Sequence, residues 1–129
     1  MTKHVLTILA VDDVARARAF YGAAFGWAIT VDVPVYVELT LPGGMRLGLY
    51  ERTGFGRNTG QVPARVPAGE LLPTELYLHA DDLDAACARL EAAGARLLSA
   101  RAARPWGDEV AYYADPDGNV LAVAREAAR

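Results

Sequence analysis

Residues 106–123 read WGDEVAYYADPDGNVLAV, and this stretch has the pattern of two strands joined by a tight turn. Within the turn, DPDGN at 115–119, proline fixes φ at the second turn position, and glycine and asparagine accept positive φ. Val110, Tyr112 and Val120 are among the β-prone residues that flank the turn. The stretch therefore predicts a β-hairpin.

Two further segments predict a pair of matching helices. Asp13 and Asp82 stand before the helices as caps, because a carboxylate accepts hydrogen bonds from free backbone N–H groups. Gly26 and Gly94 end them. The caps are 69 residues apart, and at that offset the apolar stripes also match. The matched pairs are Val14 with Leu83, Ala17 with Ala86, Tyr21 with Leu90 and Ala24 with Ala93.

Strand patterns surround each helix in the same order, so the chain is predicted to be a duplicated βαβββ unit of the α+β class. We expect module 1 at residues 1–50 and module 2 at residues 73–129. Neither module has a large core of its own, so the two should form one structural domain or exchange in a swapped dimer. The expected strands are residues 4–11, 28–33, 35–41, 45–50, 74–80, 97–101, 109–115 and 119–125.

The connection between the modules, residues 51–72, is rich in glycine and proline and poor in large apolar side chains. This composition predicts a linker that is exposed at least in part. A connection of this length is either a functional loop or a crossing between modules. Phe55, between Gly54 and Gly56, is then either a lid over a ligand or a subunit contact.

Composition narrows the functional classes. The chain has 129 residues, of which 53% are hydrophobic and 22% charged, so it can bury a core. The net charge is −3 without a basic cluster, which argues against a nucleic-acid or anionic-membrane surface. No run is apolar for about 18 residues, as a membrane span requires. With no signal-peptide pattern and a single cysteine, Cys87, predicted as a small core residue, we expect a cytoplasmic protein.

The chain resembles the vicinal oxygen chelate superfamily, which includes glyoxalase I, fosfomycin-resistance enzymes, extradiol dioxygenases and bleomycin-resistance proteins. The matching segments are residues 13–21 with Gly26, residues 81–94, residues 106–107 and residues 115–119. The resemblance covers essentially the whole chain. It implies open, cup-shaped mixed sheets around a shared cavity, and usually a homodimer.

The resemblance also locates the positions where metal-dependent members hold their ion. In this chain those positions are Leu6, Gly48, Glu75 and Ala122. One carboxylate cannot hold a divalent ion, which needs several converging oxygen or nitrogen atoms. His4, two residues from Leu6, is interpreted as a surface histidine at the strand edge. We therefore predict neither a metal site nor a cofactor.

Small or apolar residues at these positions predict an apolar pocket with aromatic walls and a few polar anchors. Strand alternation places Tyr77 and His79 on the same face as Glu75. The resemblance and the alternation together give a predicted ligand-binding set. The set is Leu6, Tyr36, Arg46, Gly48, Tyr50, Phe55, Glu75, Tyr77, Arg104, Trp106, Tyr113 and Ala122.

Several of these residues allow two interpretations. Trp106 is either a flat surface for a planar ligand, aided by Arg104, or a lid over the sheet edge. Glu75 is either a general base or anchor, or the partner of an arginine such as Arg46. His79 is either a proton shuttle or a structural surface residue. Trp27 is assigned to the core or to a subunit interface.

The leading functional hypothesis is a metal-independent protein that sequesters an apolar or planar aromatic natural product, and so confers antibiotic resistance. The first alternative is a metal-free lyase, isomerase or cyclase with Glu75 as general base. The second is a divalent-metal-dependent lyase or dioxygenase. The expected partners are a small molecule and a second copy of the chain, with neither nucleic acid nor membrane.

Overall fold

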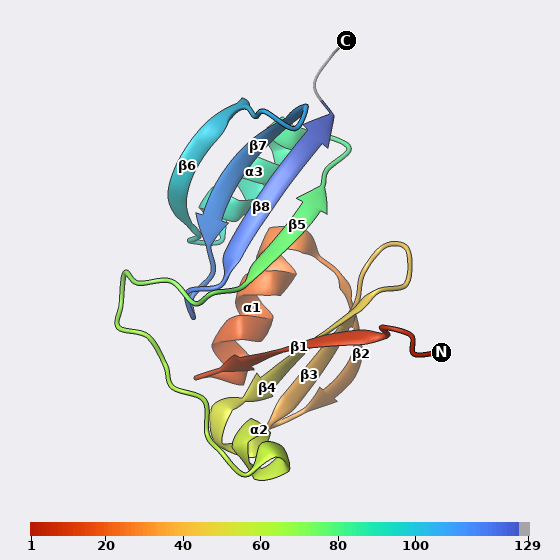
Figure 1. Cartoon of the computed structure of the whole chain (residues 1–129), viewed down its shortest axis with the longest axis vertical. Coiled ribbons are helices and arrows are strands. Elements are labelled where there is room, and N and C mark those ends of the chain that lie inside the picture. The colour runs from red at the N-terminus through yellow and green to blue at the C-terminus, as the bar shows by residue number, and fades with distance from the viewer. Residues whose placement is uncertain (127–129) are drawn as a thin grey trace. The chain divides into compact units, whose positions relative to one another are not determined.

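The computed structural model describes residues 1–126. Each half of the chain forms a four-stranded mixed sheet, and these sheets can be followed in Figure 1. The first compact unit holds residues 1–22 and 26–65, and the second holds residues 23–25 and 66–126 of the described chain. The predicted α+β duplication is confirmed; residues 127–129 of the expected second module lie outside the described part. The elements are β1 (Leu6–Val11), α1 (Val14–Phe25), β2 (Ala28–Val33), β3 (Tyr36–Thr40), β4 (Arg46–Glu51), α2 (Arg52–Thr59), β5 (Glu75–His79), α3 (Leu83–Ala92), β6 (Arg96–Ala103), β7 (Asp108–Ala114) and β8 (Val120–Glu126). Within residues 1–126, no helix combines the length and apolar character that crossing a membrane requires.

The two sheets have the same topology. Their strand orders are β1-β4-β3-β2 and β5-β8-β7-β6. In each, the first strand of the unit runs parallel to the last strand, and the other neighbours are antiparallel. The last strand of each unit, β4 or β8, therefore lies inside its sheet with a neighbour on both sides.

Both helices begin as the sequence predicts. The Asp13 carboxylate accepts a hydrogen bond from the backbone N–H of Arg16 at 3.0 Å, and Asp82 accepts one from Ala85 at the same distance. Gly26 ends α1 in the left-handed conformation, with φ of 65°. The predicted stripe of α1 is buried along its whole length, including Ala17 and Tyr21. Capping and periodicity therefore fix both helices locally.

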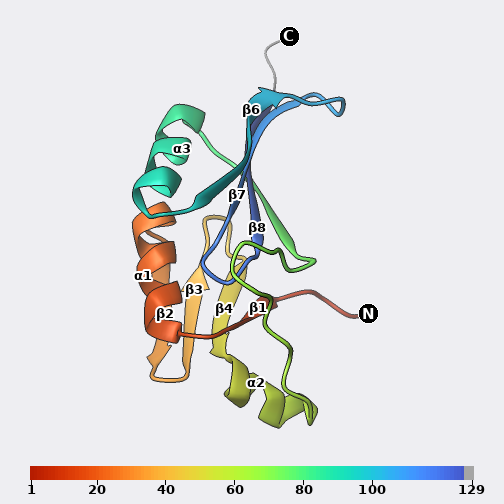
Figure 2. The same ribbon diagram turned by 90° about the vertical axis from the view of Figure 1, so that its left-hand side faces the viewer.

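Each sheet has one face that packs toward a helix and one that its own helix leaves uncovered. In the first unit, buried side chains such as Leu9, Val37 and Leu49 occupy the covered face, and Arg18 on α1 forms an ion pair with Asp32 on β2 at 3.0 Å. Figure 2 shows α1 and α3 each running along one side of strands of its own unit. We call the other sides the open faces. The first open face carries Leu6, Ile8, Val31, Val33, Tyr36, Glu38, Thr40, Arg46, Gly48 and Tyr50; the second carries Glu75, Tyr77, His79, Asp108, Val110, Tyr112, Ala122 and Ala124.

The segment predicted as a linker contains a helix, α2. Glu51 caps it by accepting hydrogen bonds from the backbone N–H groups of Thr53 at 3.0 Å and Gly54 at 2.8 Å. The glycines serve packing here: a Cβ on Gly54 would lie 2.7 Å from the Tyr50 ring, and one on Gly56 would lie 2.7 Å from Val62. Gly54 and Gly56 therefore reflect close contacts, whereas Gly60 and Gly69 have positive φ and open surroundings, and most of residues 60–72 are exposed as predicted.

The turn at residues 115–119 is a buried hydrogen-bonded unit. One oxygen of Asp115 accepts the backbone N–H groups of Asp117 at 2.9 Å and Asn119 at 2.8 Å, and the Asn119 amide donates to the other oxygen at 2.9 Å. The Thr74 hydroxyl donates to the Asn119 side-chain carbonyl. The predicted hairpin is confirmed, and its turn is also tied to the residue that precedes β5.

Replacing Gly118 with alanine is expected to destabilise the protein by about 2 kcal/mol or more. Gly118 has φ of 95°, and its Cβ would lie 2.8 Å from the carbonyl oxygen of Glu70. Gly94→Ala is the matched control, because Gly94 has φ of 90° but no atom within 4 Å of a Cβ, so it should cost only about 1 kcal/mol. Urea denaturation measures the unfolding free energy of both variants. Equal losses of stability would contradict the clash between a Cβ at position 118 and the Glu70 carbonyl.

Candidate functional site

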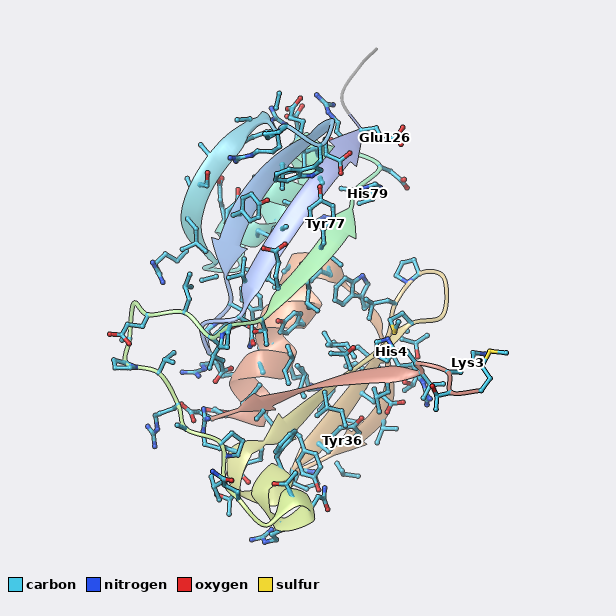
Figure 3. The ribbon with its side chains drawn as sticks, viewed as in Figure 1. Lys3, His4, Tyr36, Tyr77, His79 and Glu126 are labelled. Atoms are coloured by element: carbon cyan, nitrogen blue, oxygen red, sulfur yellow. The ribbon has the colours of Figure 1, made fainter. Side chains whose placement is uncertain are left out.

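Four side chains on the second open face form one connected cluster, which we call the Trp106 cluster. The Trp106 indole N–H donates a hydrogen bond to the Tyr77 hydroxyl at 2.8 Å, and that hydroxyl donates to Oδ2 of Asp108 at 2.5 Å. Nε2 of His79 lies 3.2 Å from the same carboxylate oxygen. Figure 3 shows Tyr77 and His79 close together on β5, and their ring centroids are 5.9 Å apart.

Small residues on the central strand make room for this cluster. β8 lies between β5 and β7, and its open-face residues opposite Tyr77 and His79 are Ala122 and Ala124, both fully buried. Two methyl groups leave space above β8, so side chains from the strands on either side can meet there. A side chain larger than that of Ala122 would occupy this space.

The turn between β6 and β7 places the indole. Within it, the backbone N–H of Arg104 donates to the Asp108 carbonyl at 2.8 Å, and Gly107 N–H donates to the Arg104 carbonyl at 3.0 Å. The Arg104 side chain donates to the carbonyls of Ala100 at 3.0 Å and Val110 at 2.9 Å. We predicted that Arg104 assists Trp106 in stacking; the structure shows its guanidinium engaged with backbone, which fixes the strands that carry the turn.

In the Trp106 cluster, the Trp106 and Tyr77 rings are exposed to solvent, whereas the Asp108 carboxylate is largely buried. Trp106 is 58% exposed and Tyr77 is 41% exposed. The Asp108 side chain is only 15% exposed, while that of His79 is 59% exposed. An exposed indole beside an exposed phenol is a surface that a flat apolar molecule can cover.

The hydrogen bonds also set the protonation of the cluster. The bond from Tyr77 lowers the pKa of Asp108 below its ordinary value, and His79 adds to the effect. Burial, followed by the bond to Asp108, raises the pKa of Tyr77. At neutral pH the carboxylate is therefore charged and the phenol protonated, so the donor direction from indole to phenol to carboxylate is fixed.

One predicted ligand-binding residue lies on the other face of this sheet. Tyr113 is 1% exposed, and its hydroxyl donates to Glu91 on α3 at 3.2 Å. Tyr112 takes the open-face position instead, with the Arg104 guanidinium carbon 5.1 Å from its ring centroid. Alternation correctly separated the two tyrosines, but our choice between them was wrong, since the pattern alone does not show which face the helix covers.

The first open face has a buried carboxylate near its centre. Glu38 is 7% exposed; it accepts a hydrogen bond from the Tyr36 hydroxyl at 2.7 Å, and Arg46 Nη1 lies 3.3 Å from its other oxygen. Burial, followed by the bond to Glu38, raises the pKa of Tyr36 far above its ordinary value. The Tyr36 ring also meets Tyr50 edge to face, with centroids 5.3 Å apart.

The residues at the metal positions of this fold do not fit a divalent ion. A Cβ on Gly48 would lie 2.6 Å from the Tyr36 hydroxyl oxygen, so that hydroxyl occupies the space where a metal-binding side chain would start. Leu6 and Ala122 offer no donor atom. Within residues 1–126, no three histidine, cysteine, aspartate or glutamate side chains come together as a metal site requires.

Two other predictions concern Glu75 and Phe55. Glu75 is one possible partner of an arginine such as Arg46, and within the first unit the carboxylate that pairs with Arg46 is Glu38. Glu75 is exposed at the start of β5, and no hydrogen bond or ion pair holds it in the described part of the chain. Phe55 belongs to α2 and packs edge to face against Tyr50 with centroids 6.2 Å apart, so the loop predicted around it is a helix, and its role as a lid or a subunit contact stays a prediction.

Glu38 and Asp108 were not among the residues predicted from the sequence. Alternation from Tyr36 would have placed Glu38 on the same face, and alternation from Val110 would have placed Asp108 beside it. Trp27, assigned to core or interface, stacks on Tyr21 at 6.3 Å within the first unit. His4 lies 3.0 Å from the Thr7 hydroxyl, at the surface as predicted.

Two βαβββ units with helix-covered and open faces define the class of paired-module proteins to which this chain belongs. A family model described as a glyoxalase-like domain matches residues 6–124. The protein is therefore a member of the glyoxalase-like domain family, within the vicinal oxygen chelate superfamily. No curated protein matches it.

Solved structures share this fold under several names. A glyoxalase-related enzyme from Fulvimarina pelagi has a TM-score of 0.81 and 24% identity over 96% of this chain and 88% of its own. A glyoxalase/bleomycin resistance protein/dioxygenase family enzyme from Burkholderia phytofirmans gives 0.80 and 20%, over 95% and 98%. A lactoylglutathione lyase from Agrobacterium tumefaciens gives 0.71 and 24%, over 96% and 93%. At these identities the similarity shows the fold alone.

Tyr36→Phe is expected to destabilise the protein by about 1–2 kcal/mol at pH 8, because it removes a hydrogen bond to a buried carboxylate. The raised pKa of Tyr36 means that this stabilisation is complete below about pH 10, the ordinary tyrosine value, and is lost as pH rises above it. The difference in unfolding free energy between wild type and variant should therefore narrow above pH 10.

Urea denaturation at several pH values measures this narrowing. Tyr50→Phe is the control, since its hydroxyl accepts only a 3.4 Å hydrogen bond from Asn58. If the difference in unfolding free energy between wild type and Tyr36→Phe stays constant up to pH 11, the stabilising hydrogen bond from the Tyr36 hydroxyl to Glu38 is contradicted.

Proposed function

We propose that this protein binds a planar aromatic small molecule on its second open face, without a metal ion, and sequesters the molecule unchanged. The observation that carries the proposal is Trp106, an indole that is 58% exposed and yet held in place by its hydrogen bond to Tyr77. A fixed aromatic surface loses little conformational freedom when a ligand covers it. Sequestration of a toxic natural product, and hence antibiotic resistance, is the role we assign to this binding.

The chemistry of the surface supports an aromatic ligand with a polar edge. Stacked aromatic pairs contribute about 0.5–1.5 kcal/mol beyond the burial of their area. The Trp106 and Tyr77 rings supply that area, while Asp108 and His79 supply charged and hydrogen-bonding atoms a few ångströms away. A few polar groups beside a mainly apolar surface are what fix a ligand's orientation in small-molecule sites.

Two observations support binding without a metal. Gly48 lies beneath the Tyr36 hydroxyl, and Ala122 lies beneath the space that the Trp106 cluster uses. Each of these positions would hold a metal-binding side chain in the metal-dependent relatives that the sequence resembles. Here each makes room for a tyrosine that donates to a carboxylate.

A metal-free lyase, isomerase or cyclase is the second candidate. Glu75 favours it, because this carboxylate is exposed on the same open face and has no partner within residues 1–126. The His79–Asp108 pair also favours it, since a carboxylate that orients an imidazole is a common arrangement for a general base.

Homodimer formation stays a prediction, which light scattering of the purified protein tests.

Trp106→Ala is expected to weaken the binding of doxorubicin, a planar aromatic antibiotic, by at least tenfold, because the stacking surface is lost. Trp106→Phe should lose less affinity than Trp106→Ala, because it keeps an aromatic ring but not the hydrogen bond to Tyr77. Trp27→Phe is the matched control and should leave affinity unchanged, because Trp27 stacks on Tyr21 within the first unit. Isothermal titration in chelator-treated buffer gives the affinities, and mass spectrometry shows whether the antibiotic is recovered intact.

Equal affinity of wild type and Trp106→Ala would contradict the site. Binding that requires added Ni²⁺, Mn²⁺, Zn²⁺ or Fe²⁺ would contradict the metal-free mode.

Glu75→Gln separates sequestration from catalysis. If the protein sequesters, the substitution should change affinity by less than about threefold, because an exposed carboxylate contributes little to binding. If Glu75 is a base, the variant should bind but lose conversion of the ligand. Product analysis by mass spectrometry after incubation with wild type and variant decides between the two, and conversion by wild type alone would favour the enzyme.

A further inference from the structure

A concave site lies at the edge of the first unit and is formed by none of the residues of the Trp106 cluster. It is a groove of about 440 Å³ between residues 3–5, which lead into β1, and residues 43–46, which lead into β4. Its basic lining residues are Lys3, His4 and Arg46, and no acidic side chain is among them. A local concentration of basic groups is unexpected on a chain whose net charge is −3.

A tight turn forms one wall of the groove. The backbone N–H of Gly44 donates to the Leu41 carbonyl at 3.0 Å, with Pro42 and Gly43 at the centre of the turn. Gly43 has φ of 90°, which the third position of this turn requires, and Gly44 after it has φ of 95°. Neither glycine has any atom within 4 Å of a Cβ position, so the space beside this wall is open to a ligand.

The basic side chains are held to different extents. Arg46 is oriented by the buried Glu38, which lies 3.3 Å from one terminal nitrogen, while the Arg46 side chain stays 42% exposed. His4 is positioned by its 3.0 Å contact with the Thr7 hydroxyl. Lys3 has no hydrogen-bond or ion-pair partner within residues 1–126, and Figure 3 shows it next to His4 on the segment before β1.

We propose that this groove binds a small, multiply charged oxyanion whose charges are phosphate or carboxylate groups. Arginine offers a planar set of N–H donors that matches both groups, and lysine adds a mobile point charge. Glu38 already engages one terminal nitrogen of Arg46, which aims the guanidinium and leaves its other N–H groups available. The groove is then a second binding site, independent of an aromatic ligand on the second open face.

A solvated basic surface would attract anions only diffusely, so the proposal predicts saturable binding. Isothermal titration with pyrophosphate and with citrate, at constant ionic strength, is expected to give one site per chain. The double substitution Lys3→Gln/His4→Gln should weaken binding at least tenfold. Arg89→Gln, which removes an exposed cation from α3 in the other unit, is the matched control and should leave affinity unchanged.

Comparison of the two anions identifies the chemistry: tighter pyrophosphate binding assigns a phosphate ligand, and tighter citrate binding a carboxylate. Lys3 is the only lysine in the chain, so protection of its amine from acylation gives a second readout by mass spectrometry. The absence of saturable binding for both anions would overturn the proposal. Equal anion affinity of wild type and the double variant would also overturn it. So would a loss of affinity in Arg89→Gln as large as that in the double variant.

Discussion

The second unit depends on the buried carboxylate of Asp115. Its two oxygens hold the turn between β7 and β8, and Asn119 extends the network to Thr74, the residue before β5. Three strands thereby obtain a common register, and a slip by one residue would move every side chain to the opposite face. The Trp106 cluster needs that register, because its members come from β5, from β7 and from the turn before β7, and meet above β8. A structural turn thus sets the geometry of a binding surface.

Local signals explain why so much of the fold could be predicted. An aspartate cap, a 3.6-residue apolar period and a terminal glycine each act within one helix, so they can be recognised in the sequence and then in its repeat 69 residues later. Helix α2 was not predicted, because its glycines at 54 and 56 are explained by close contacts with Tyr50 and Val62. Those contacts come from tertiary packing, which composition does not encode.

The candidate site was harder to predict for the same reason. Trp106 and Tyr77 were identified from their types and positions, but the acid that connects to them, Asp108, lies 31 residues from Tyr77. Glu38 was missed although it is only two residues from Tyr36, because the sequence gives no sign that its carboxylate is buried. Alternation assigns a side chain to one of two faces, yet the choice between Tyr112 and Tyr113 depends on which face the helix covers.

The two units have adapted the same fold in related ways. In each, a tyrosine hydroxyl donates to a carboxylate on the open face, beside a residue without a functional side chain, Gly48 or Ala122. The surroundings then separate their roles. Glu38 is buried and paired with a cation, so its charge is largely satisfied within the unit. Asp108 lies instead beneath exposed rings, where a ligand can reach the cluster, and this difference is why we place aromatic binding on the second open face.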